Sequence, residues 1–252
     1  DVMVDWMPSA LAAREKGLPL VNIAQPFKSS GMMLTCRKDM GVNSTADLKG
    51  KTLGVWFYGN EYPFLSWMSR LGLKTDGSAN GVTVLRQGWG VEPLTEGQAA
   101  CVSTMSYNEY WVVRDAGYSP EQLTVFKYQS EGAATLEDGL YVHEKNLSDA
   151  AFKDKMVRFV RASMKGWKYA EANPKEAAMI ILDNDDAGVQ TEKHQVRMMG
   201  EIAKLTAGSN GSLDPADYER TVKVLMSGDS DPVITKKPSG AWTNEITNAA
   251  LN

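Results

Sequence analysis

Polar and aromatic side chains gather in a few short segments, each of which directly follows a stretch of apolar residues. The segments are Tyr58-Gly59-Asn60-Glu61, Trp89 between two glycines, and Tyr107-Asn108-Glu109, and Trp6 follows a further apolar stretch. Aromatic rings stack on flat ligands, whereas amides and carboxylates bind the hydrogen-bonding edges of such ligands. This set favours recognition of a flat, polar ring over the breaking of a bond.

Side chains for the common catalytic routes are scarce. The two histidines, His143 and His194, lie near no strand-end turn that holds a cysteine or serine. The sequence contains no G-x-S-x-G, H-E-x-x-H, G-x-G-x-x-G or P-loop pattern and no clustered Cys/His ligands. Nucleophilic, zinc and dinucleotide chemistry are therefore unsupported, and we expect no cofactor and no metal.

Each of these segments also has a purely structural interpretation. Asn108 could only cap a helix, and Glu109 could only complement its dipole. Gly59 and Asn60 could simply supply the backbone angles that reverse the chain. Trp6 could fill the core. These alternatives stay open at the level of sequence.

Apolar strand-like stretches alternate with short amphipathic helices in the first 142 residues. We expect strands near 2–4, 18–24, 31–36, 52–57, 82–85, 100–104, 123–128 and 139–142. Such alternation predicts an α/β fold with mostly parallel sheets flanked by helices. In an open parallel sheet, ligands bind beyond the carboxyl ends of the strands, and the segments above begin there.

The sequence becomes helical from Ser148 onward. One amphipathic helix runs to Asn173, and Pro174 opens the next. Further amphipathic stretches are 192–205 and 215–226, which end in Gly208 and Gly228, and a short helix starts at Thr243. The apolar stripe of the first helix indicates packing rather than a cofactor site.

Composition excludes several classes of partner. The 252 residues are 43% hydrophobic and 23% charged, with a net charge of -4 and a pI near 5.4. No apolar run approaches the roughly 20 residues that span a bilayer, so we expect no direct membrane insertion. Lys and Arg are scattered, which argues against nucleic acid. A small molecule or another protein is the expected partner.

The chain contains two cysteines, Cys36 and Cys101, which lie far apart in apolar strand-like stretches. They form neither a CxxC pair nor a disulfide framework of the kind seen in small secreted domains. We expect both to be buried free thiols.

Three stretches carry a resemblance to a known family. They are Asp5 to Leu20, Ala46-Asp47-Leu48-Lys49-Gly50-Lys51-Thr52-Leu53-Gly54-Val55, and Gly97 to Glu109. The sequence resembles type II periplasmic solute-binding proteins of ABC importers, in the branch that includes binders of thiamine pyrimidine precursors and pyrimidine synthases. The resemblance implies two lobes, 1–36 with 139–252 and 37–138, which close by a hinge around a ligand cleft. It also implies a monomeric, exported periplasmic protein with an ABC permease partner in the inner membrane.

Two departures from the family pattern bear on function. The family begins with another strand, helix and strand, and nothing here corresponds to them, so we expect either that the sequence is partial or that this part of the first lobe is rebuilt. The synthase branch needs a cysteine-rich run and a histidine. This chain has Gly132-Ala133-Ala134-Thr135 and Ser9 there, which argues against an enzyme.

The leading hypothesis is a binding protein for a small aromatic heterocycle, an aminopyrimidine thiamine precursor. Glu109 would accept two hydrogen bonds from the aminopyrimidine while Trp6, Tyr58 or Trp89 stacks on its ring. A flavin-like heterocycle and an aliphatic sulfonate are alternative ligands. Sulfonate is disfavoured, because two carboxylates at the strand ends would repel an anion. The rival classes are an iron-using pyrimidine synthase and a structural protein in which Trp6 and Trp89 are buried.

Overall fold

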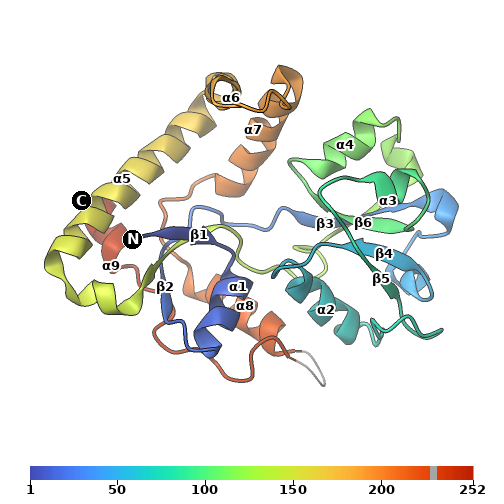
Figure 1. Cartoon of the computed structure of the whole chain (residues 1–252), viewed down its shortest axis with the longest axis horizontal. Helices are drawn as coiled ribbons and strands as arrows, with labels where there is room; N and C mark the ends of the chain where they lie inside the picture. Colours follow the sequence, from blue (N-terminus) through green and yellow to red (C-terminus); the bar gives the residue numbers. More distant parts are fainter. Residues whose placement is uncertain (228–231, 252) are drawn as a thin grey trace. The chain divides into compact units, whose positions relative to one another are not determined.

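The computed structural model describes residues 1–227 and 232–251, and the chain divides into two compact units (Figure 1). Unit 1 comprises residues 1–30, 135–222 and 234–252, and unit 2 comprises residues 31–134 and 223–233, within the described residues. Whether these units are the lobes of a ligand clamp, with the boundaries predicted from the sequence, stays a prediction.

Unit 1 is built on a three-stranded sheet with the order β1 (Met3–Asp5), β8 (Gly139–His143), β2 (Leu20–Ala24). Helix α1 (Met7–Glu15) connects β1 to β2, which confirms the predicted strand, helix and strand. Both strands are antiparallel to β8 and hence parallel to each other. The carboxyl ends of β1 and β2 therefore lie at the edge of the sheet where β8 begins.

Helices make up most of the remainder of unit 1. They are α5 (Ala150–Ala172), α6 (Pro174–Asp183), α7 (Glu192–Thr206) and α9 (Glu245–Leu251), while α8 (Pro215–Met226) continues into the unit 2 range. The Asp149 carboxylate caps α5 by accepting from the N–H of Ala151 at 2.9 Å. Met156 and Val160 of α5 pack on Ile23 and Val142 of the sheet. The predicted packing stripe is confirmed, and the predicted stop at Gly228 lies outside the described residues.

Unit 2 contains a five-stranded sheet with the order β5 (Thr83–Arg86), β4 (Thr52–Val55), β6 (Cys101–Met105), β3 (Met32–Arg37), β7 (Leu123–Lys127). Its helices are α2 (Glu61–Arg70), α3 (Glu92–Thr95) and α4 (Glu109–Asp115). A 3-10 turn, η2 (Thr45–Leu48), has a capping box between Ser44 and Asp47. Strand β4 pairs in parallel with β5 and β6, so three adjacent strands end at one edge.

The α/β fold with helix-flanked sheets is confirmed, and most strands of each sheet share one direction, but β3 and β8 run against their neighbours. Strand β3 is antiparallel to both of its neighbours, β6 and β7, and β8 is antiparallel to β1 and β2. A crossover helix between two strands of one sheet forces them to be parallel. Strands β3 and β8 instead begin shortly after the chain passes from one unit to the other, so no such crossover fixes their direction.

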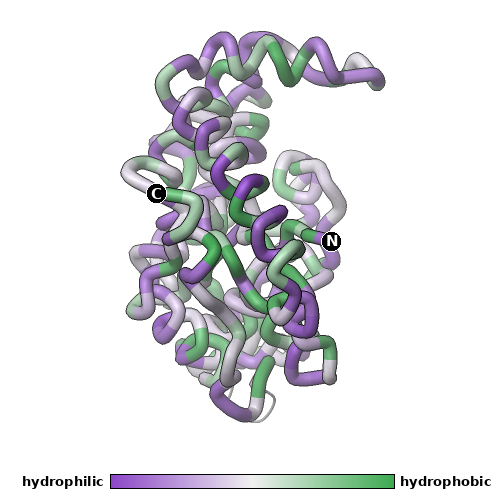
Figure 2. The backbone as a smooth tube through the Cα atoms, turned by 90° about the vertical axis from the view of Figure 1, so that its left-hand side faces the viewer, coloured by the Kyte–Doolittle hydropathy of each residue, from purple (hydrophilic) through white to green (hydrophobic). Residues whose placement is uncertain are grey.

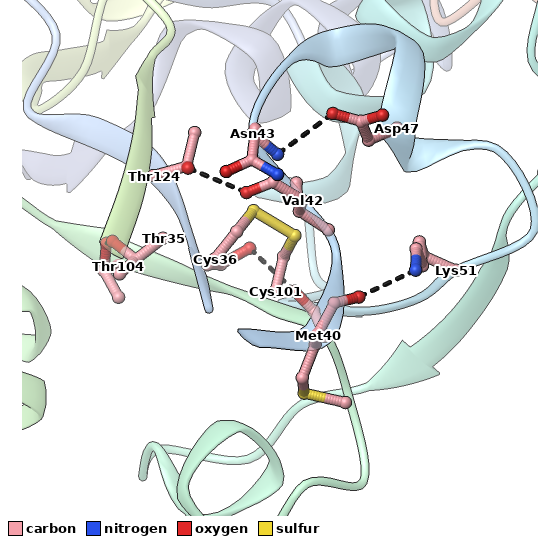
Figure 3. The surroundings of a disulfide bond; sticks show 12 residues. Thr35, Cys36, Met40, Val42, Asn43, Asp47, Lys51, Cys101, Thr104 and Thr124 are labelled. Atoms are coloured by element: carbon pink, nitrogen blue, oxygen red, sulfur yellow. Dashed lines mark hydrogen bonds between the residues drawn. A yellow bond between two sulfur atoms is a disulfide. The ribbon is translucent and has the colours of Figure 1, made fainter. Parts of the chain in front are cut away.

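The prediction of free thiols is wrong, because Cys36 and Cys101 form a disulfide with Cα atoms 3.9 Å apart (Figure 3). The two residues face each other across the antiparallel β3–β6 pair. The N–H of Arg37 donates to the carbonyl of Ala100 at 3.0 Å, so the cysteines occupy the adjacent, non-hydrogen-bonded position. Side chains approach each other most closely at such positions. Register therefore brings together two thiols that are 65 residues apart in sequence.

Hydrophobic residues occur in short segments along the whole backbone (Figure 2). Within residues 1–227 and 232–251, no helix combines the length and the apolar character that a membrane span requires.

Candidate functional site

The three predicted segments of unit 2 meet at one edge of its sheet. Tyr58 to Glu61 follow β4, Trp89 follows β5, and Tyr107 to Glu109 follow β6. Because these strands are adjacent and parallel, their carboxyl ends lie side by side. We call this the unit 2 edge. The sequence pattern predicted it because each segment begins where a strand ends.

The turn after β4 places an aromatic ring in solvent. The Tyr58 side chain is 88% exposed, and its φ of 66° lies in the left-handed region. The turn is held by Glu61, whose Oε2 accepts the N–H of Gly59 at 2.7 Å, and by Asn60, whose Nδ2 donates to the Phe57 carbonyl at 3.1 Å. Asn60 makes no side-chain cap to α2. The polar residues of this segment therefore shape the turn that presents Tyr58.

Arg86, the last residue of β5, is a member of this edge that sequence reasoning missed. Its guanidinium carbon lies 4.8 Å from the centroid of the Tyr58 ring and 5.1 Å from that of Phe57. A cation within about 6 Å of an aromatic face is attracted by it. The only sign of Arg86 in the sequence is a single basic residue at the end of a predicted strand, and such residues are common on protein surfaces.

Trp89 is 95% exposed, between Gly88 and Gly90. The preceding residue, Gln87, is buried and clamps the loop to β6. Its Nε2 donates to the carbonyls of Ser103 (3.0 Å) and Gly90 (3.2 Å), while its Oε1 accepts the Ser103 N–H at 2.9 Å. The indole is thus held out from a fixed loop. The structural-protein hypothesis requires a buried Trp89 and is contradicted.

The segment after β6 uses its polar groups within its own turn. Glu109 is 9% exposed. Its Oε2 accepts a hydrogen bond from the backbone N–H of Met105 at 2.9 Å, and its Oε1 accepts one from Nδ2 of Asn108 at 2.7 Å. Burial raises the pKa of the Glu109 carboxyl, and these hydrogen bonds oppose the rise. Asn108 makes no side-chain cap to α4, and Tyr107 is half-buried. A carboxylate oxygen can accept more than one bond, so a ligand contact of Glu109 stays a prediction.

Trp6 belongs to unit 1, at the carboxyl end of β1. It is half-buried, its backbone N–H donates to Asp5 Oδ1 at 2.8 Å, and its side chain is near enough to the Asp138 carboxyl to lower the pKa of that group against the larger rise that burial causes. Asp5 pairs with Gly139 in the β1–β8 register, so both carboxylates lie at this sheet edge. Burial raises the pKa of both the Asp5 and the Asp138 carboxyl. We call Asp5, Trp6 and Asp138 the unit 1 edge. Sequence reasoning missed the two aspartates, although Asp5 directly follows a strand.

The two edges supply rings for stacking and carboxylates, amides and a guanidinium for hydrogen bonding. Neither brings a histidine or thiol near a serine, the arrangement that nucleophilic catalysis needs. In the described part of the chain, no group of three or more His, Cys, Asp or Glu residues is arranged to hold a metal ion. Both edges carry the kinds of side chain that line small-molecule sites.

The family model described as NMT1/THI5 like matches residues 1–177. A formylaminopyrimidine-binding protein from Halalkalibacterium halodurans is 23% identical over 253 residues, covering 96% of this chain and 74% of that protein. Among solved structures, a Bordetella bronchiseptica protein has a TM-score of 0.72 at 20% identity, covering 99% of this chain and 80% of that one.

Two further solved structures share the fold. A putative sulfonate ABC transporter protein from Methylobacillus flagellatus, the periplasmic sulfonate-binding protein SsuA, gives a TM-score of 0.67 at 13% identity, covering 100% of this chain and 74% of its own. The desulfurization enzyme DSZB also gives a TM-score of 0.67 at 14% identity, covering 99% of this chain and 84% of its own. These likenesses show the fold alone. The family match over residues 1–177 confirms the resemblance found in the sequence: the chain belongs to the NMT1/THI5 like family.

Proposed function

We propose that this protein is the substrate-binding component of an ABC importer and that it captures a small aromatic heterocycle, an aminopyrimidine thiamine precursor. The observation that carries the proposal is the pair of exposed aromatic rings, Tyr58 and Trp89, on the unit 2 edge. The two rings follow neighbouring strands, β4 and β5. Their exposure does not stabilise the fold, because apolar area left in water is unfavourable. Stacking on a flat ring gives them a use.

Each edge also carries hydrogen-bonding groups suited to an aminopyrimidine. An exocyclic amino group and a protonated ring nitrogen are donors, and the acceptors are the Glu109 carboxylate on the unit 2 edge and the Asp5 and Asp138 carboxylates on the unit 1 edge. Trp6, Gly59, Asn60, Glu61, Tyr107 and Asn108 complete the proposed binding set. The formylaminopyrimidine-binding relative supports this choice of ligand.

The disulfide supports the proposed location. Disulfides persist in oxidising compartments such as the bacterial periplasm and are rare in the cytosol. The sulfonate-binding structural neighbour is described as a periplasmic protein of an ABC transporter. We therefore propose an exported, periplasmic, monomeric protein that acts without a cofactor and delivers its ligand to a permease.

The test is calorimetry of the purified protein against N-formyl-aminomethyl aminopyrimidine, riboflavin and octanesulfonate, together with mass spectrometry of any co-purified ligand. We expect the pyrimidine to bind most tightly. Trp89→Ala should weaken its binding by about 1–3 kcal/mol, which is roughly 5- to 150-fold, because a stacked ring is lost. Removing a 95% exposed side chain leaves the core untouched.

Tyr169→Ala is the matched control, because Tyr169 is an exposed aromatic residue, 43% accessible, on helix α5 of unit 1. Its removal should leave the affinity unchanged. Equal binding by wild type and Trp89→Ala would remove Trp89 from the site. Tightest binding of riboflavin or octanesulfonate would replace the pyrimidine with that ligand, and turnover of a bound compound would establish an enzyme instead.

A further inference from the structure

The unit 2 edge carries a cation without an acidic partner. Arg86 is exposed and stacks on two aromatic rings, with its guanidinium carbon 4.8 Å from the centroid of Tyr58 and 5.1 Å from that of Phe57. Among residues 1–227 and 232–251, no carboxylate lies within ion-pair distance of it and no group accepts its hydrogen bonds. Aromatic stacking occupies the faces of the guanidinium and leaves the N–H donors in its plane free.

The backbone is arranged to make this stack. Consecutive residues of an extended strand point to opposite faces, so Phe57 and Tyr58 would not normally meet the same cation. The φ of 66° at Tyr58 turns the chain so that both rings face Arg86. Among the described residues, no other non-glycine residue has a positive φ. Such a conformation is costly for a tyrosine, and costly backbone conformations concentrate at binding sites.

The neighbouring carboxylates do not cancel this charge. Glu61 Oε2 accepts the Gly59 N–H, and both oxygens of Glu109 accept hydrogen bonds inside their turn. The expected repulsion of an anion by these two carboxylates is therefore weaker than their positions in the sequence suggest.

We propose that Arg86 receives an oxyanion of the ligand, a phosphate or sulfonate group, while Tyr58 and Trp89 contact the remainder of the molecule. The inference rests on the proposed function and extends it to aminopyrimidines that carry such a group, which should bind more tightly than those that lack it. A guanidinium presents a planar fork of donors that matches two oxygens of a phosphate or sulfonate, and an ammonium does not. The Phe57 and Tyr58 rings hold that fork in one orientation, so less side-chain entropy is lost on binding.

The experiment compares three ligands by calorimetry at low salt: 4-amino-5-hydroxymethyl-2-methylpyrimidine, its phosphate ester, and octanesulfonate. In the wild type we expect the phosphate ester to bind about 10- to 100-fold more tightly than the alcohol, because a charge-assisted pair is added. This ratio should fall towards one in Arg86→Gln and take an intermediate value in Arg86→Lys. It should also shrink as salt is added, because Arg86 is exposed.

Lys49→Gln is the matched control, because Lys49 is exposed and precedes β4, at the opposite end of that strand. It removes the same charge and should preserve the ratio. Binding of octanesulfonate alone, lost in Arg86→Gln, would support the role of Arg86 and overturn the proposed pyrimidine ligand. Equal wild-type affinities for the alcohol and its ester, or no binding of either anion, would overturn the inference. Binding of the alcohol alone would leave the proposed function standing.

Discussion

Removal of the cross-strand disulfide by Cys36→Ala with Cys101→Ala should destabilise unit 2 strongly. The bond closes a loop between residues 65 apart, and both cysteines are fully buried. The loop-entropy relation gives about 4 kcal/mol for a loop of this length, since the cross-link restricts the unfolded chain. With a urea dependence of about 2 kcal/mol per M, the unfolding midpoint should fall by roughly 2 M.

Hydrogen exchange with mass spectrometry across a urea series assigns the loss to one unit. In the alanine variant, peptides of β3, β6 and β7 should lose protection at lower urea than in the wild type. Peptides of α5 and α7 belong to unit 1, which the bond does not cross-link, and serve as the internal reference. Adding reductant to the unfolded wild type should reproduce the lower midpoint on refolding.

A control separates the cross-link from general disturbance of the sheet. Thr35 and Thr104, drawn beside the disulfide in Figure 3, share a buried hydroxyl hydrogen bond of 2.7 Å across the same two strands. Replacing both by valine removes donor and acceptor together and should be nearly neutral. Equal midpoints for the oxidised wild type and the double alanine variant would refute the entropic argument and weaken the case for an oxidising compartment.

Two further predictions concern the unit 2 edge. Because burial raises the folded-state pKa of Glu109, its contribution to stability is present below the ordinary glutamate pKa and is lost as pH rises through the raised value. The stability of wild type relative to Glu109→Gln should therefore fall as pH rises above about 4, and urea titrations showing a pH-independent difference would contradict this. At Tyr58, the left-handed backbone should make Tyr58→Gly more stable than Tyr58→Ala by about 0.5–1 kcal/mol, the reverse of the usual order. Chemical denaturation decides it, and a more stable alanine variant would show that φ is relaxed at this residue.

The strand ends of unit 2 could be predicted from sequence because they depend on local signals. An apolar run followed by polar turn residues marks the end of a strand, and the segments at Tyr58, Trp89 and Tyr107 were found in this way. The parallel β5, β4 and β6 then brought them to one edge. The role of each polar group was not predictable. Glu109 and Asn108 bond to each other, and this depends on side-chain geometry within the turn.

Long-range pairing could not be predicted, since it depends on register between distant strands. Cys36 and Cys101 meet because β3 lies next to β6 and runs antiparallel to it. Nothing near either cysteine indicates this partner. The same limit concealed the direction of β8, which separates β1 from β2. A helix between two strands predicts that they are parallel, as β1 and β2 are, but it does not exclude a third strand inserted between them.

Arg86 shows why a binding group can be invisible in a sequence even when its surroundings are predicted correctly. An exposed arginine at a strand end is ordinarily a solvated charge. Its significance comes from Phe57 and Tyr58, which lie about 30 residues earlier and reach it only because β4 and β5 are adjacent and the backbone at Tyr58 is left-handed. That combination changes the chemistry assigned to the edge. Carboxylates alone favour a cationic or amino-bearing ligand, whereas a stacked guanidinium beside internally bonded carboxylates can also bind an oxyanion.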